Sequence, residues 1–105
     1  MIRGTTPAYT LTIAGYDLTQ MTVFVTVRGQ YGTLVTKTGD ALTVTADATG
    51  STIAFRLTQE ETLALTVGRA EVQVRFIDAN GIALATEIAP VTVERVLLGG
   101  VIEYE

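Results

Sequence analysis

The side chains best suited to acid–base chemistry in this sequence are its carboxylates, because the chain contains no histidine and no cysteine. Two of them, Glu60 and Glu61, are adjacent, whereas glycoside hydrolysis needs two carboxylates held across a cleft, one with a raised pKa. They follow Thr58 in a Thr-x-x-Glu pattern, typical of a helix capping box in which Thr58 caps the amide of Glu61. We therefore assign Thr58 and Glu61 to a helix cap and predict no catalytic residue: the protein is not an enzyme.

A second group of polar side chains lies in Asp78-Ala79-Asn80-Gly81, which offers fewer oxygen ligands than a calcium site needs. Asp, Asn and Gly are also residue types that are common in turns. Asn80-Gly81 predicts a type I′ hairpin turn with positive φ at both residues, leading into the apolar run that begins at Ile82. Gly29-Gln30-Tyr31-Gly32 is too short for a phosphate-binding loop. We predict no metal and no cofactor.

Composition and charge exclude further classes of function. Eleven acidic and seven basic residues give a net charge of −4, which argues against a nucleic-acid surface. With 48% hydrophobic and 17% charged residues, the chain is too apolar to be disordered. No window approaches the apolar length of a membrane span, and residues 1–7 carry one charge and a Thr-Pro break rather than a signal peptide. We expect no nucleic-acid partner, no membrane partner and no export signal.

The dominant pattern along the chain is an alternation of polar and apolar residues, typical of strands with one buried face. Turn residues recur about every 8–12 positions, the spacing of a sandwich or barrel. We predict an all-β, immunoglobulin-like antiparallel sandwich of about seven strands with one short helical turn at 58–65; a small β-barrel is the alternative. Pro90 marks an edge or a bulge, since it cannot donate a ladder hydrogen bond. The expected strands are 8–14, 21–28, 32–37, 41–47, 51–57, 69–77 and 82–95.

The inward positions of these strands predict the hydrophobic core. Its members are Leu11, Ile13, Val23, Val25, Val27, Leu42, Val44, Ile53, Phe55, Leu57, Val72, Val74, Phe76, Ile82, Leu84, Val91 and Val93.

The C-terminal residues differ from the rest of the chain. We expect one sandwich domain over 1–98 and an extension over 99–105, joined by a Gly99-Gly100 hinge. Beyond the hinge, Val101, Ile102 and Tyr104 are unusually apolar for a free tail and alternate like a strand. An isolated strand of this length is unstable, so the segment either pairs with an edge of its own domain or is donated to a neighbour. Val101, Ile102 and Tyr104 are therefore the candidate interaction segment.

Several local features follow one another in an order that resembles a known family. They are Asp17-Leu18-Thr19 ahead of a strand, a strand ending in Leu57-Thr58, a short acidic helix at 59–62, Gly68 before an alternating strand, and an Asp78-x-x-Gly81 hairpin. This order resembles the N-terminal domain of the baseplate upper proteins, and of related tail proteins, of phages that infect Gram-positive bacteria. The resemblance extends over residues 8–95.

The resemblance implies a non-catalytic sandwich that assembles with copies of itself or with other virion subunits. In that family the domain precedes receptor-binding or fibre segments, whereas this sequence ends at Glu105. The implied role is a tail, baseplate or head–tail accessory subunit of a phage or prophage, found in the virion and assembled in the cytoplasm of the bacterial host. A binding module of the same fold, for carbohydrate or peptide, is the alternative.

Overall fold

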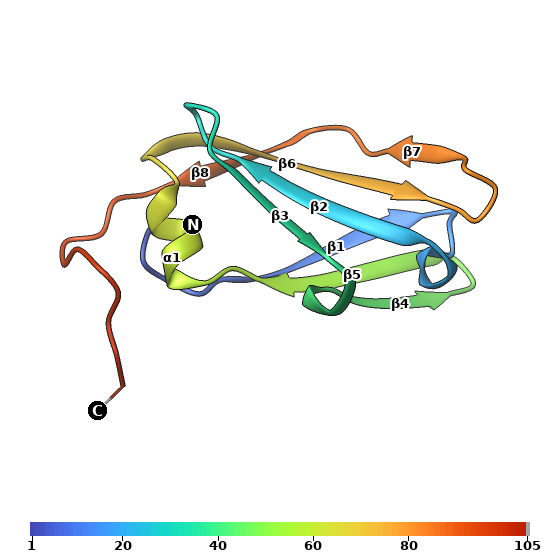
Figure 1. Ribbon diagram of the computed structural model, residues 1–105, viewed down its shortest axis with the longest axis horizontal. Helices are drawn as coiled ribbons and strands as arrows, with labels where there is room; N and C mark the ends of the chain where they lie inside the picture. The colour runs from blue at the N-terminus through green and yellow to red at the C-terminus, as the bar shows by residue number, and fades with distance from the viewer. Residues whose placement is uncertain (105) are drawn as a thin grey trace.

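The computed structural model describes residues 1–104 and contains eight strands in two antiparallel sheets that face each other (Figure 1). One sheet has the order β1 (Ala8–Ala14), β5 (Gly50–Arg56), β4 (Thr43–Asp47). The other has the order β3 (Leu34–Thr38), β2 (Thr22–Arg28), β6 (Gly68–Ile77), and the far side of β6 carries both β7 (Ala83–Ala85) and β8 (Ala89–Val93). The helix α1 (Gln59–Ala64) and the 3-10 turns η1 (Leu18–Gln20) and η2 (Gly39–Ala41) connect strands.

This strand order confirms the predicted fold class. The sheets β1-β5-β4 and β3-β2-β6-β7/β8 correspond to the B-E-D and C′-C-F-G sheets of immunoglobulin-like sandwiches, with no strand beyond β1 in the described residues. The last predicted strand, 82–95, is instead two strands, because three residues (86–88) lie between β7 and β8 where β6 has only two (73 and 74), and this bulge interrupts the pairing. Pro90 lies inside β8 opposite Glu71 and, as expected for proline, on a sheet edge.

The core lies between the two sheets and is built from the inward positions of the alternating strands. Its buried members are Leu18, Val23, Val25, Val27, Val35, Leu42, Ile53, Phe55, Leu57, Leu65, Ala70, Val74, Phe76 and Val93. The prediction was wrong for Ile82, which is 59% exposed in a loop, and for Leu84, which is 38% exposed. Leu84 sits on the edge strand β7, which pairs with β6 on one side only, so its side chain has no neighbour on the other side in the same sheet. Val91 is partly buried and is not among the residues packed against the core cluster.

The predicted hairpin between β6 and β7 is present, but the predicted type I′ turn is wrong. Gly81 has φ +81°, whereas no described residue other than glycine has positive φ, so Asn80 does not. The Gly81 N–H donates to the Asp78 carbonyl (3.2 Å), which makes a type I turn followed by a left-handed glycine. The Asp78 carboxylate selects this geometry by accepting from the N–H groups of Asn80 and Ile82, both at 2.9 Å.

Substitutions in this turn distinguish the two geometries. We expect Gly81→Val to lower the free energy of unfolding by about 1–2 kcal/mol, because a β-branched residue is strained at positive φ. Asn80→Ala is the matched control and should cost less than about 0.5 kcal/mol, since Asn80 has negative φ. Urea denaturation measures both values. Equal losses of unfolding free energy in the two variants would indicate a type I′ turn instead.

Candidate functional site

The end of the sandwich that carries α1 is where most side-chain hydrogen bonds between distant segments converge, and we call it the α1 pole. It contains residues 1–7, α1 and residues 94–102. Figure 1 shows the N-terminus beside α1 and the C-terminal segment leaving the sandwich from this end.

The predicted capping box is present at the start of α1. The Thr58 hydroxyl accepts from the Glu61 N–H (3.1 Å), and the Glu61 carboxylate accepts from the Thr58 N–H (2.8 Å). Lys37 on β3 adds an ion pair to the same carboxylate, with 2.6 Å between Lys37 Nζ and Glu61 Oε1. The contacts of the Glu61 carboxylate therefore stabilise the fold, and its ion pair with Lys37 links β3 to α1.

These contacts set the charge state of Glu61. Partial burial raises the pKa of its carboxyl, but the hydrogen bond from Lys37, the Thr58 N–H and the charge of Lys37 together outweigh burial and hold the pKa below its ordinary value. A lowered pKa favours the carboxylate, which is unsuited to a general acid. The hydroxyl and N–H of Thr19 likewise lower the pKa of Asp17, and those of Thr49 lower the pKa of Asp47, in two separate loops.

The stabilising effect of Glu61 should depend on pH. Its pKa in the folded protein lies below the unfolded value near 4.5, so its contribution is complete above that pH and is lost as the pH falls through the folded pKa. We expect Glu61→Gln to cost about 0.5–1 kcal/mol at neutral pH and progressively less below about pH 4. Urea denaturation across this pH range measures the difference. Glu60→Gln is the control, because Glu60 is exposed and forms no ion pair within residues 1–104; a pH-independent loss in Glu61→Gln would contradict the prediction.

The N-terminal residues bind α1 through Thr62, a contact that sequence reasoning missed. Thr62 is completely buried, and its hydroxyl accepts from the Gly4 N–H (2.9 Å) and lies within donor distance of the Thr5 carbonyl (2.9 Å). The Arg3 guanidinium donates to the Leu63 carbonyl (2.7 Å). Residues 1–7 therefore fasten α1 to the end of β8, where Ile2 forms a parallel bridge with residue 94.

The C-terminal segment reaches the α1 pole but does not form the predicted strand. The Ile102 N–H donates to Gln59 Oε1 (2.8 Å), and Gln59 Nε2 donates to the Ile102 carbonyl (3.0 Å), so one side-chain amide takes the place of a neighbouring strand. Val101 lines a hollow of about 450 Å³ with Thr6 and residues 56–60. The side chains of Ile102 and Tyr104 remain exposed, that of Tyr104 completely. Of the extension, residue 105 lies outside the described residues.

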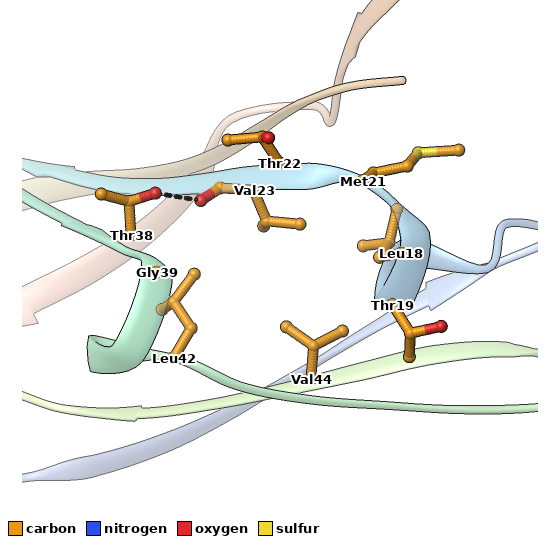
Figure 2. Close-up of a pocket in the computed structure, with 9 residues that line it drawn as sticks. All are labelled: Leu18, Thr19, Met21, Thr22, Val23, Thr38, Gly39, Leu42 and Val44. Carbon is orange, nitrogen blue, oxygen red and sulfur yellow. Dashed lines mark hydrogen bonds between the residues drawn. The ribbon is translucent and has the colours of Figure 1, made fainter. Parts of the chain in front are cut away.

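A second hollow, of about 340 Å³, opens between η1, β2, η2 and β4 (Figure 2). Figure 2 shows Leu18, Val23, Leu42 and Val44 pointing into one space, and the Thr38 hydroxyl donating to the Val23 carbonyl (2.7 Å). The lining is apolar apart from threonine hydroxyls and contains no titratable side chain. It can hold a small apolar group but supplies neither a general acid nor a general base.

The remaining polar residues of the sequence are not brought together. Within residues 1–104, no three histidine, cysteine, aspartate or glutamate side chains lie close enough to hold a metal ion. The β6–β7 hairpin, which contains Asp78, Asn80 and Gly81, lies at the end of β6 opposite to the end that follows α1. No helix in this part of the chain has the length and apolar character needed to cross a membrane.

Compared by sequence with known proteins, the chain matches no family model and no curated protein. The fold is a β-sandwich of two antiparallel sheets, and at its α1 pole the side-chain amide of Gln59 binds the backbone of Ile102 from the C-terminal segment.

Proposed function

We propose that this protein is a non-catalytic structural or assembly subunit of a phage or prophage virion, in the tail, baseplate or head–tail region, and that it acts by protein–protein contacts. The observation that carries the proposal is the C-terminal segment. It leaves the sandwich with Leu97 94% exposed and Leu98 71% exposed, and within residues 97–104 it contacts the domain again through Gln59 and the hollow at Val101. Exposed large apolar side chains in a row are typical of an interaction site. The order of strands and turns that resembles phage tail proteins supports the virion as its location.

The proposal is tested in the bacterium that carries the gene. After phage production is induced, we expect gradient-purified particles to contain the chain by mass spectrometry. Ile102→Asp with Tyr104→Asp should reduce the amount incorporated several-fold, since charge opposes burial of the segment. The control, Val67→Asp with Ile82→Asp, changes two other exposed apolar residues outside the C-terminal segment and should be incorporated normally. Intact particles without the chain, in normal yield, would overturn the proposal.

A binding module for peptide or carbohydrate is the second candidate, favoured by one observation. A hollow of about 240 Å³ on the outer face of the β3-β2-β6 sheet combines exposed Leu34 and Ile88 with the polar side chains of Arg28, Glu71 and Gln73. Such a mixture fits a short extended peptide better than a sugar, because no aromatic platform lines it. Binding to a peptide or glycan array that is lost in Ile88→Asp would favour this function.

A further inference from the structure

The outer edge of β1 pairs with no other strand in residues 1–104. Among the described strands β1 pairs with β5 alone, in a continuous register from Ala8 opposite Arg56 to Ala14 opposite Gly50. The Leu57 N–H donates to the Pro7 carbonyl (3.1 Å), and the Gly15 N–H donates to the Thr49 carbonyl (3.0 Å). Since hydrogen-bonding direction alternates along a strand, the odd-numbered residues face β5. The N–H and C=O groups of Ala8, Thr10, Thr12 and Ala14 therefore point to the open edge.

This edge lacks the features that protect the other edges from pairing. Proteins block free edges with charged side chains, proline, bulges or short strands. The edge strand β3 carries Lys37, β4 ends in Asp47, and the β7/β8 edge is interrupted and contains Pro90. β1 is seven residues long, has no bulge in its register with β5, and contains no charged residue and no proline.

The sequence of β1 is also self-complementary. Ala8-Tyr9-Thr10-Leu11-Thr12-Ile13-Ala14 has the same order of residue classes in both directions from Leu11. Two antiparallel copies related by a two-fold axis at Leu11 would therefore match alanine with alanine, threonine with threonine, and tyrosine with isoleucine. Closed two-fold symmetry is the commonest form of self-association.

We propose that β1 is a dimerisation strand, which pairs antiparallel with β1 of a second copy and joins two three-stranded sheets into one continuous sheet. The proposal rests on the assembly function proposed above and names the partner as a second copy of this chain.

The hydrogen bonds agree with this register. Centring the pair on Leu11 places Thr10 opposite Thr12 of the second copy, and Ala8 opposite its Ala14. These are the residues whose backbone groups are free, so the pairing forms about eight new interstrand hydrogen bonds, two for each hydrogen-bonded pair. The two Leu11 residues meet in a non-hydrogen-bonded pair, in which side chains are closest.

The side chains agree as well. The inward residues Tyr9, Leu11 and Ile13 are only partly buried, although they pack against the core. Leu11 and Ile13 line a hollow of about 180 Å³ together with Val72, beside the interruption between β7 and β8. Dimerisation brings Tyr9 of the second copy opposite Ile13, at this hollow. Aromatic–β-branched and threonine–threonine pairs across strands are both favourable.

A single cysteine tests the register directly, because the chain has none of its own. In a non-hydrogen-bonded pair the two Cα atoms lie about 4.5 Å apart, within the range of a disulfide. We expect Leu11→Cys, under mild oxidation, to run on a non-reducing gel at twice the 11.2 kDa of the chain. Val44→Cys is the matched control, a partly buried inward position on the edge strand β4. Cross-linking of Leu11→Cys no greater than that of Val44→Cys would overturn the proposal.

Light scattering of the full-length protein, from micromolar to millimolar concentration, tests the interface without a cross-link. Thr10→Lys with Thr12→Lys should weaken dimerisation by about tenfold or more, since like charges then face each other across the axis. Thr10→Glu with Thr12→Glu should do the same, and mixing the two variants should restore the dimer. Thr43→Lys with Thr45→Lys makes the same change on the outward face of β4 and should leave the dimer intact.

The outcomes separate this proposal from the proposed function. A wild-type protein that stays monomeric at every concentration overturns the β1 dimer, even where the chain is found in purified particles. A β1 dimer of a chain that is absent from particles supports the interface and overturns the virion role. Failure of the lysine and glutamate variants to pair on mixing overturns the Leu11-centred register.

Discussion

We expect Thr62→Val to lower the free energy of unfolding by about 2–3 kcal/mol, although valine has nearly the same shape as threonine. The Thr62 side chain is completely buried at the α1 pole, and its hydroxyl accepts from the Gly4 N–H and contacts the carbonyls of Thr5 and Gln59. Valine leaves the Gly4 N–H and the Thr5 carbonyl partly buried without this partner, and the desolvation of such groups is costly. Urea denaturation monitored by circular dichroism gives the difference.

Thr66→Val is the matched control, because it makes the same change to a hydroxyl in a different setting. The Thr66 hydroxyl is buried and has no hydrogen-bond partner among the described residues. Removing an unpaired buried hydroxyl should leave the stability unchanged or raise it by up to about 1 kcal/mol. A loss in Thr66→Val equal to that in Thr62→Val would show that the hydroxyl contacts of Thr62 are not the source of its effect.

The strands and the helix could be predicted from the sequence because their signals are local. Alternation in β6, where Val72, Val74 and Phe76 point inward between polar neighbours, fixes both the strand and its buried face. The helix start was equally local, since both halves of the capping box lie within four residues. Boundaries were correct to within about two residues wherever a turn or cap ended the element.

The errors came where a side chain or the tertiary structure overrode the local pattern. Asn80-Gly81 favours a type I′ turn by sequence, but the Asp78 carboxylate binds two backbone N–H groups and holds a type I turn instead. Leu84 alternates correctly, yet it lies on the edge strand β7, where one side of its side chain has no neighbouring strand. Leu18 and Leu65 are buried from η1 and from the end of α1, so no strand periodicity marked them.

At the α1 pole, the local features could be predicted from the sequence, but the contacts between distant residues could not. Thr58 and Glu61 could be assigned from their spacing, and Ile102 from its apolar neighbours beyond the glycine hinge. The partners of the pole could not be predicted, because Gly4 and Thr62 are 58 positions apart, and Gln59 and Ile102 are 43 apart. The Gln59 side-chain amide bonds the backbone of Ile102 as a neighbouring strand would, and such a contact leaves no pattern in the sequence. Whether the C-terminal segment binds other subunits stays a prediction.

The second large effect is expected at the start of β5. Gly50 pairs with Ala14 on one side and Asp47 on the other, so its α-carbon lies between two neighbouring strands. A methyl group there would meet the Ile13 carbonyl oxygen at 2.3 Å and the Ala14 α-carbon at 2.8 Å, both of them backbone atoms that cannot rotate away. We expect Gly50→Ala to lower the free energy of unfolding by about 3 kcal/mol or more, since the sheet must separate locally to admit the methyl group.

Two other glycines separate this steric effect from backbone strain and should give a graded series in urea denaturation. A methyl group at Gly99 meets no described atom within 4 Å, and its φ is not left-handed, so Gly99→Ala should change stability by less than about 0.5 kcal/mol. Gly15 has equally open surroundings but φ +84°, so Gly15→Ala should cost about 1 kcal/mol from strain alone. Gly50 also has a positive φ, +155°, so the excess loss in Gly50→Ala over Gly15→Ala measures the close contact of β5 with β1 beyond the backbone strain that both positions share. Losses of equal size at the two positions would show that the strands can shift to accept a side chain, and that the register of this sheet is less tightly fixed than its geometry indicates.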